Sequence, residues 1–475
     1  MSGLLNALSI SLSALTADKA EVDVTSENLA NANTPGYAQR RIVLQEQPAL
    51  VSGPLGDIGG GVTASSVESV RDPLLDSRVQ QETQQQSANQ EIVNAMQPVQ
   101  TLFTTGNGGV PDAMTAFFSG LQLLSTSPTD PTLRATALTD ANNLAEAFQN
   151  TASQLTSTQQ NLDLGVTQTV GQVNQLTAQL AQTNAQLSTA QASGLSGNDL
   201  EDRQQNLLSQ LSNLIGYSVT QSSQGLTLTT ANGSPLVVGG DSFALSTAGN
   251  STTGFQDVLS AQGQDITSQI TAGQLGGLIQ ARDGQIAAAL SSLNTLASNF
   301  ATAINNVNTA GYDGNGKKGL AMFSVAAGSG AAESMSVTLT DPSQIAASLS
   351  PPASSGNSSA GSSSTPSGDN SNLLAMINVG NQPLVNSDTP TQYLSNLVFQ
   401  VGNGVSQAQS EADAGSLMLQ QLQDEQGSVE GVSTDEQASD LITYQRAYQA
   451  AAQVVTVVDG LMLASINLGV ETAMT

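Results

Sequence analysis

The residue types that most often carry catalysis are scarce in this sequence. None of the 475 residues is Cys or His, which excludes thiolate nucleophiles, His-based triads and metal sites built on thiolate or imidazole. Carboxylates, Ser, Tyr and the lysines Lys19, Lys317 and Lys318 remain. None of these lysines lies in an apolar stretch typical of a Schiff-base lysine, so few residues of the chain could act as a catalytic base or nucleophile.

Two short motifs deserve a chemical test, and both favour a structural interpretation. Asp313-Gly314-Asn315-Gly316-Lys317 begins like a calcium loop, but Lys317 takes a ligand position and no Glu closes the loop, so we expect a polar turn. The run Gly59-Gly60-Gly61 lacks the Gly-Lys-Ser/Thr ending of a phosphate loop. The acidic residues show no paired-carboxylate pattern. We therefore expect no enzyme, no cofactor and no metal.

The excess of acidic residues limits the kinds of partner that the protein could bind. The formal net charge is −27, from 38 acidic and 11 basic residues, and the acids are scattered along the chain. Phosphate backbones and anionic lipids should repel such a surface, so we expect neither nucleic acid nor membrane as a partner. The first basic residue is Lys19, and Leu alternates with polar residues before it, unlike a secretory signal peptide. No stretch reads as an uninterrupted apolar membrane span.

The elements that should organise the chain are long helices at its two ends. At the N-terminus an apolar row with a 3/4 spacing, interrupted at Lys19 and Ser26, predicts a helix from Ser2 to about Ala32, ended by Pro35-Gly36. A similar row predicts a helix from Asp435 to about Leu468, and Thr434 with Gln437 has the spacing of a capping box. The two rows consist of Leu5, Leu8, Leu12, Leu15, Val22 and Leu29, and of Leu441, Tyr444, Tyr448, Ala451, Val455, Val458 and Met462.

These heptad helices could pair as an antiparallel or loosely parallel coiled coil. An ordinary seam inside one subunit is the alternative, because periodicity does not say whether the partner helix belongs to the same chain.

Between the ends the pattern is mainly helical with one β-rich region. A heptad row predicts a rod-like helix that ends near Gly194, and alternation with the turn Asn232-Gly233 predicts strands over 216–274. Further helices are expected at 80–103, 112–126, 201–215, 276–309 and 390–426. The row of the long helix consists of Leu144, Phe148, Leu155, Leu162, Val173, Leu176, Leu180 and Leu187. The fold class is thus mainly α with a β-rich subdomain, elongated and multidomain.

The N-terminal stop signal resembles the signature shared by flagellar rod, hook and hook-associated proteins. Its residues are Asn28, Asn31, Asn33, Thr34, Pro35, Gly36 and Tyr37. An independent match runs from Gly431 through the segment Leu441–Ala450. Internal segments such as 112–124, 200–214 and 273–282 are similar to the hook-associated members, and flagellin lacks the Asn-Thr-Pro-Gly-Tyr pattern. The resemblance covers most of residues 1–340 and 373–470.

The resemblance implies a structural subunit, exported through the flagellar type III apparatus, that polymerises at the distal end of the hook and joins hook to filament. Its implied partners are copies of itself, hook protein, a second hook–filament junction protein and an export chaperone at the C-terminal helix. The apolar rows at both ends would be the polymerisation interface. A hook or rod subunit is one alternative, and a secreted hydrolase or adhesin with flagellar-type ends is another, from a different class.

The same reading divides the chain into five parts. We expect residues 1–40 and 427–475 to form an axial polymerisation domain of paired terminal helices, and residues 216–275 to form the β-rich subdomain. The helical middle domain should comprise 41–215, 276–322 and 373–426. Relatives commonly carry an additional outer domain, of which 323–349 would be a remnant, followed by a Ser/Gly/Pro linker at 350–372.

Overall fold

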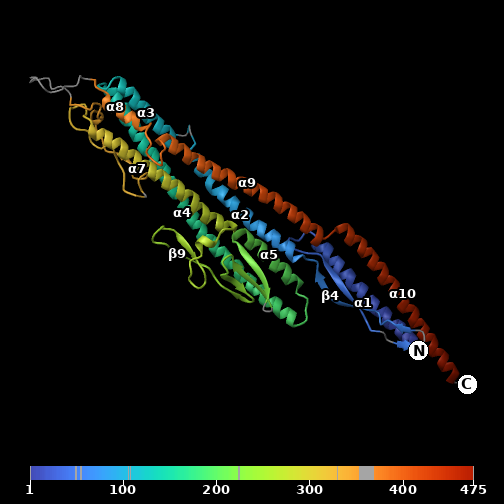
Figure 1. Ribbon diagram of the computed structural model, residues 1–475. Coiled ribbons are helices and arrows are strands. Elements are labelled where there is room, and N and C mark those ends of the chain that lie inside the picture. Colours follow the sequence, from blue (N-terminus) through green and yellow to red (C-terminus); the bar gives the residue numbers. More distant parts are fainter. Residues whose placement is uncertain are drawn as a thin grey trace, which may run out of the picture.

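The computed structural model describes residues 2–48, 51–53, 56–104, 106, 108–222, 225–328, 330–351 and 368–473. Long helices run lengthwise through an elongated molecule, and both chain termini lie at the same end (Figure 1). Most of the predicted linker, residues 352–367, lies outside the described residues. The predicted class, mainly helical with a small β-rich part, is confirmed.

The two terminal helices, α1 (Ser2–Asn31) and α10 (Thr434–Ala473), lie side by side and antiparallel, and we call them the terminal pair (Figure 1). Both predicted helices are therefore present. The predicted capping box is wrong, because the backbone N–H of Glu436 bonds the hydroxyl of Ser433 at 3.4 Å and the Gln437 side chain bonds Asn28 instead.

Within 41–69, which the sequence placed in the helical middle domain, the described residues form strands and loops and no helix. Strand β1 (Arg40–Glu46) pairs antiparallel with β4 (Val62–Ser69), and β2 (Val51–Gly53) pairs with β3 (Gly56–Ile58). The β-branched residues of this stretch favour extended backbone. The pair β1–β4 packs against α1.

The glycine run before β4 makes this packing possible. Gly61 has φ +96°, and a Cβ there would lie 2.2 Å from the Ser13 hydroxyl of α1. Only a residue without a side chain permits so close an approach. The structure thus gives this run a packing role in the loop before β4.

Six long helices build the rod, and four of them were predicted with similar bounds. Pro at the first helical turn and Asp or Thr caps begin several of them, as at Asp72, Asp130 and Thr389. The whole predicted row of α4 is buried or half-buried, which confirms it as a core seam. The helices are α2 (Pro73–Leu102), α3 (Val110–Thr126), α4 (Pro131–Ala192), α5 (Asn198–Leu214), α7 (Ala287–Ala310) and α9 (Pro390–Glu430).

The β-rich region lies beside α4. Four antiparallel strands pair in sequence order, two more pair separately, and the predicted Asn232-Gly233 turn joins β6 to β7 with Gly233 at φ +85°. After them α6 (Gly273–Ile279) continues through a π-helical segment, Gln280–Ile286, into α7, where one uninterrupted helix was expected. The strands are β5 (Tyr217–Ser222), β6 (Gly225–Thr230), β7 (Pro235–Val238), β8 (Asp241–Ser242), β9 (Ser246–Gly249) and β10 (Gln256–Leu259).

The end of the rod far from the termini holds an aromatic core. Phe117 packs edge-on against Phe300 with ring centroids 5.7 Å apart, and Phe323 lies 5.9 Å from both. Strand β11 (Phe323–Ser324) pairs with β12 (Ser336–Val337) there. A short helix, α8 (Ser371–Val379), was not predicted and covers α3 and α7. It begins within the last residues of the expected linker.

Candidate functional site

The apolar row predicted for α1 is only partly covered in this chain. Leu5, Leu12 and Leu29 are exposed by 55%, 47% and 39%, and the other three members are half-buried. Mostly small or polar residues are buried on α1 instead: Ser11, Ala17, Val24, Thr25 and Asn28. Small side chains let α1 approach its neighbours closely, and Leu5, Leu12 and Leu29 are left largely exposed.

The row predicted for α10 does follow the seam. Val458 is 6% exposed, Tyr448 is 39% exposed, and the other five members are half-buried. Since α1 is the element that α10 contacts most, this row faces the partner helix of the same chain. The structure brings the two rows into one helix pair.

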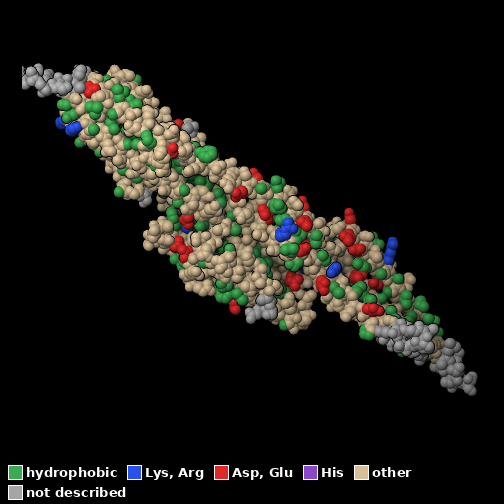
Figure 2. All heavy atoms as spheres, viewed as in Figure 1, with side chains coloured by type: hydrophobic (Ala, Val, Ile, Leu, Met, Phe, Trp, Pro, Cys, Tyr) green, Lys and Arg blue, Asp and Glu red, His purple; other side chains and the backbone are tan. Residues whose placement is uncertain are grey.

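A second apolar row on α10 was missed by the sequence reading. Val454, Val457 and Leu461 are exposed by 48%, 61% and 52%, and their spacing of three and four places them on one face of the helix. The signal was present in the sequence, but the seam row outweighed it. Hydrophobic side chains are visible along this end of the molecule (Figure 2).

One stretch of the C-terminal helices has the length and apolar composition of a membrane span. The helical stretch Pro390–Ile466 contains an 18-residue window that is long and apolar enough to cross a membrane by length and composition alone, and only 6% of that window is buried. No such span was expected. The core helix of a soluble protein and a signal sequence meet the same criterion, so one such stretch does not by itself indicate a membrane span.

Asn28, from the signature segment, ties three parts of the chain together. Its amide nitrogen donates to the carbonyl oxygen of Arg40 at 2.8 Å and to Oε1 of Gln437 at 2.9 Å. Its Oδ1 accepts from the Tyr37 hydroxyl at 2.8 Å and from the Arg40 N–H at 2.9 Å. The side chain is 1% exposed, so all its hydrogen-bonding groups are satisfied inside the protein.

The other signature residues shape the turn after α1. Asn31 bonds back to the carbonyl of Glu27 at 3.1 Å, and its Oδ1 accepts from the Thr34 hydroxyl at 3.2 Å. Gly36 has φ +78°, and Asn206 of α5 donates to the carbonyl of Pro35 at 3.2 Å. The side chain of Asn33 is exposed. This turn therefore docks the end of α1 onto the rod.

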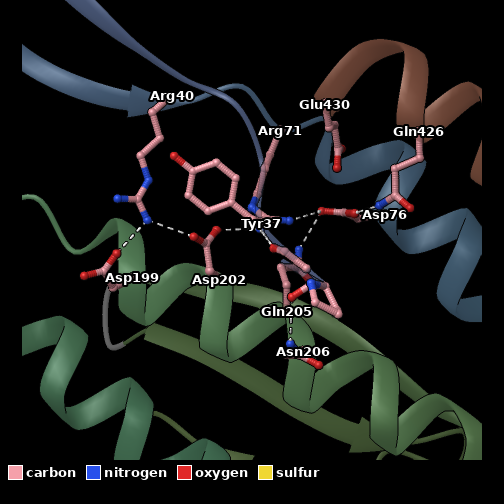
Figure 3. A network of polar contacts seen from close by, with 12 residues as sticks. Tyr37, Arg40, Arg71, Asp76, Asp199, Asp202, Gln205, Asn206, Gln426 and Glu430 are labelled. Atoms are coloured by element: carbon pink, nitrogen blue, oxygen red, sulfur yellow. Dashed lines mark hydrogen bonds and ion pairs between the residues drawn. The ribbon is translucent and has the colours of Figure 1, made fainter. Parts of the chain in front are cut away.

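Arg40, the first residue of β1, is held by carboxylates from two directions. It pairs with Glu27 of α1. It also pairs with Asp199 at 2.6 Å and Asp202 at 2.9 Å, both on α5, and its guanidinium lies 4.9 Å from the Tyr37 ring (Figure 3). These hydrogen bonds and charges raise the pKa of Arg40, although burial opposes them. Burial raises the pKa of Tyr37 to about 12. Both groups keep one protonation state in neutral solution.

A second cluster joins α2, α5 and α9. Asp76 of α2 accepts from Gln205 at 2.7 Å and from Gln426, and Glu430 accepts from the N–H of Asp72 at 2.8 Å (Figure 3). Burial, reinforced by the nearby charge of Glu430, raises the pKa of Asp76 to about 6, while Arg71 opposes the shift. The carbonyl of Glu430, the last residue of α9, also accepts from Gln39 at 2.8 Å.

We call these two clusters together with Asn28 the joint. It connects the terminal pair to the rod at the point where α9 ends and α10 begins. The sequence indicated Asn28 and Tyr37 through the signature but missed Arg40, Asp202 and Glu430, because their partners lie far away along the chain. Its charged and amide groups are mostly paired with one another, which fixes its geometry, although Nε of Arg40 and Nε of Arg71 are buried without a hydrogen-bond partner among the described residues.

The segment Asp313–Lys317, which begins like a calcium loop, has a structural role in the fold. The Asp313 carboxylate accepts from the N–H groups of Asn315 at 2.8 Å and Lys317 at 2.7 Å, so the predicted polar turn is confirmed. In the part of the chain that the structure describes, no group of His, Cys, Asp or Glu could hold a metal ion.

Comparisons with known proteins agree on one kind of protein. The family "Flagellar hook-associated protein FlgK helical domain" matches residues 96–323, "Flagella basal body rod protein" matches 8–37, and "Flagellar basal body rod FlgEFG protein C-terminal" matches 425–468. Flagellar hook-associated protein 1 of Salmonella typhimurium is 25% identical over 566 residues, covering 98% of this chain and all of the relative. The Bacillus subtilis protein of that name is 27% identical over 500 residues, covering 96% of each.

A solved structure is similar as well. The flagellar hook junction protein FlgK from Burkholderia pseudomallei superposes with a TM-score of 0.67 at 19% identity, covering 74% of this chain and all of that one. At this identity the likeness shows a shared fold.

Proposed function

The chain belongs to the family of flagellar hook-associated protein 1, the structural subunits of the bacterial flagellum at the hook–filament junction, and we propose that its terminal pair is the surface through which it assembles there. Assembly would use residues 1–40 and 427–475 as one layer. The remaining divisions are a helical middle domain (70–215, 276–322 and 373–426, without the strands at 41–69, which pack against α1), a β-rich subdomain (216–275) and an outer remnant (323–349). They describe the part that stands away from this layer.

The exposure of apolar side chains on the terminal pair is the observation that carries this proposal. Leu5 and Leu12 on α1, and Val457 and Leu461 on α10, are each about half exposed or more. Contiguous apolar surface of this kind is typical of protein interaction sites. Burying one such side chain is worth roughly 1 to 2 kcal/mol, so a few of them provide a firm contact.

The joint supports the proposal through geometry. Subunits of a regular assembly must present their contact surfaces in one orientation relative to the body. Asn28 and Arg40 hold α1, β1 and α5 together, and Glu430 holds the beginning of α10 to the same region. A defined angle between the terminal pair and the rod follows from these bonds.

We infer that the protein is not an enzyme. The relatives that match it are structural proteins of the flagellum. The carboxylates of the joint are occupied by arginines and amides, and Asp313 is occupied by its own turn. A structural role accounts for each of these groups.

The proposed partners follow from the same role. The first are further copies of the chain and the hook protein. A second hook–filament junction protein would bind on the filament side, and an export chaperone would cover the apolar faces of α10 before assembly. The net charge of −27 supports the omission of nucleic acid and membrane from the partners.

A hook-capping assay tests the proposal. Labelled protein is mixed with isolated bare hooks, and electron microscopy records the position of the label. We expect label at the distal tips only, and none after residues 1–35 are deleted. Label spread along the hooks would indicate a hook or rod subunit, and label absent from the tips would refute the proposed assembly.

A further inference from the structure

The four-stranded sheet of the β-rich region has one protected edge and one open edge. Strand β8, at one edge, is two residues long and carries Asp241. Short length and charge are features by which natural edge strands avoid pairing with other chains. Strand β5, at the other edge, is six residues long, contains neither a charged residue nor Pro, and is exposed over residues 218–221. The sheet can therefore accept one more strand beside β5.

The side chain of Gln84, on α2, shows which backbone groups of β5 face outward. Its amide accepts from the N–H of Tyr217 at 3.3 Å and donates to the carbonyl of Tyr217 at 3.3 Å, as the backbone of a neighbouring strand would. Outward-facing residues alternate along a paired strand, so the N–H and C=O groups of Val219 and Gln221 point to the same side as those of Tyr217. Among the described residues, no hydrogen-bond partner reaches these groups of Val219 and Gln221.

A groove of 380 Å³ lies beside this edge, and we call it the strand groove. Its walls are one face of α2 from Ser77 to Gln84, the first residues of β5, the turn after β6 and the segment 269–272. All of its lining side chains are uncharged. The side chain of Val219, which lines the groove, is 39% exposed. Gln84 thus takes the place of a strand at Tyr217, and the groove continues that place along β5.

We propose that the strand groove binds an extended, uncharged segment of another polypeptide, which adds a strand to the sheet at β5. The N–H and C=O groups of Val219 and Gln221 pair with the backbone of this segment, as in other cases of strand addition to a sheet edge. The segment also covers the exposed side chain of Val219. A charged segment is disfavoured because the lining side chains offer no counter-charge.

Two observations favour a single extended strand over a second copy or a sugar. Helix α2 bounds the groove opposite β5, so the whole sheet of a second copy would meet α2 before it reached the open edge. Among the described residues that line the groove, Tyr217 is the one aromatic, and it is buried with its hydroxyl donating to the carbonyl of Leu208 at 2.6 Å. No exposed ring is therefore offered on which a sugar could stack. The site belongs to the rod and is separate from the terminal pair.

A peptide with the sequence of β6, Gly225–Thr230, is the probe, because this uncharged sequence already pairs with the inner edge of β5. It is labelled with fluorescein and titrated with the full chain, and fluorescence anisotropy gives the affinity. We expect saturable binding. Two further peptides are N-methylated at alternate residues in the two possible registers. The register that removes the donors facing β5 should bind about tenfold more weakly, and the other should bind like the parent peptide.

Val219→Pro is the matched variant of the protein. Proline removes the outward N–H of residue 219 but no hydrogen bond to β6, so an edge strand tolerates it, and circular dichroism checks that the fold is kept. We expect Val219→Pro to weaken binding about tenfold, since a donor is lost from the edge. Val219→Thr keeps both the N–H and the β-branched shape, and it should bind the peptide like the parent protein.

The absence of saturable binding, or equal affinities of the two N-methylated peptides, would overturn the proposal, as would equal affinities of the parent and a folded Val219→Pro. Displacement of the peptide by maltohexaose would overturn it in favour of a carbohydrate. A concentration-dependent dimer that Val219→Pro abolishes would overturn it in favour of a second copy. Hook capping by Val219→Pro should equal that of the parent, because the strand groove acts independently of the terminal pair.

Discussion

Asn28 is the residue that connects the most segments at the joint. Replacing it with Ala removes four hydrogen bonds and leaves Gln437 and the Arg40 carbonyl without partners in a buried setting. A buried polar group left unsatisfied costs roughly 1 to 3 kcal/mol. We predict that Asn28→Ala lowers the opening free energy of the terminal pair by about 2 to 4 kcal/mol, measured by hydrogen exchange of α1 and α10.

The matched control is Asn33→Ala, in the same signature segment but with an exposed side chain. It should change exchange by less than about 0.5 kcal/mol, as is usual for surface positions. Equal effects of the two substitutions would contradict the role assigned to Asn28.

Asp76 makes the joint sensitive to pH. Its pKa is raised from 3.8 to about 6 by burial and by Glu430, with Asp72 adding to the shift and Arg71 and Gln426 opposing it. Because the folded pKa is the higher one, this group stabilises the fold fully below pH 3.8, and the contribution is lost as pH rises through about 6. The loss is roughly 2 to 3 kcal/mol, at about 1.4 kcal/mol for each pKa unit.

We therefore predict that Asp76→Asn removes a fall in stability between pH 4 and pH 7.5 that the parent protein shows. Urea unfolding of both proteins across this range measures it as the difference between their unfolding free energies at each pH. Asp424→Asn, at an exposed carboxylate of α9, is the control and should leave the profile unchanged. A flat difference between parent and Asp76→Asn would contradict the assignment.

At the scale of elements, α10 should be the least protected long helix. Its outward apolar row, Val454, Val457 and Leu461, is about half exposed. By contrast, α4 buries Leu144, Phe148 and Leu155 completely. Few buried contacts mean a low free energy of local opening. We predict that amides of 454–466 exchange at least a hundredfold faster than those of 144–155 in the dilute monomer, and that assembly slows them. Equal protection in the monomer would show that α10 needs no neighbour.

The helices could be predicted from the sequence because a long amphipathic pattern depends little on tertiary context. The exposure of Leu5, Leu12 and Leu29 could not be predicted, because periodicity identifies the most apolar face of a helix but not which of its residues pack against other parts of the same chain. The buried positions of α1 include Ala17 and Ser11, and the loop at Gly61 approaches the same helix at Ser13, a packing that only the folded chain reveals. Strands β1 and β4 were missed because half of their side chains are polar and exposed.

The joint was predictable only in part for the same physical reason. The bond between Asn28 and Gln437 joins residues 409 positions apart, and no local pattern anticipates it. The signature drew attention to Asn28 and Tyr37 by resemblance. Arg40 and Asp202 carry no signal of their own until the fold brings α1, β1 and α5 together.

Charged side chains are unevenly distributed over the face of the molecule that Figure 2 shows. Asp and Glu side chains gather over the half that carries the terminal pair and the joint, while the far half shows mainly uncharged surface (Figure 2). Copies packed at this end must overcome repulsion between like charges, so exposed apolar side chains such as Leu5, Val457 and Leu461 have to supply the attraction. Added salt should therefore strengthen assembly by screening.

Binding of point variants to hook ends tests the central claim most directly. One variant carries Leu5→Gln, Leu12→Gln, Val457→Gln and Leu461→Gln. The control carries Phe399→Gln and Leu417→Gln on α9, where both side chains are 70% exposed. Circular dichroism establishes that both remain helical, and titration of labelled protein onto isolated hooks gives the affinity for the tips. We predict a loss of at least a hundredfold, about 2.7 kcal/mol, for the first variant and little change for the control. Undiminished capping by the first variant, or an equal loss in both, would contradict assembly through the terminal pair.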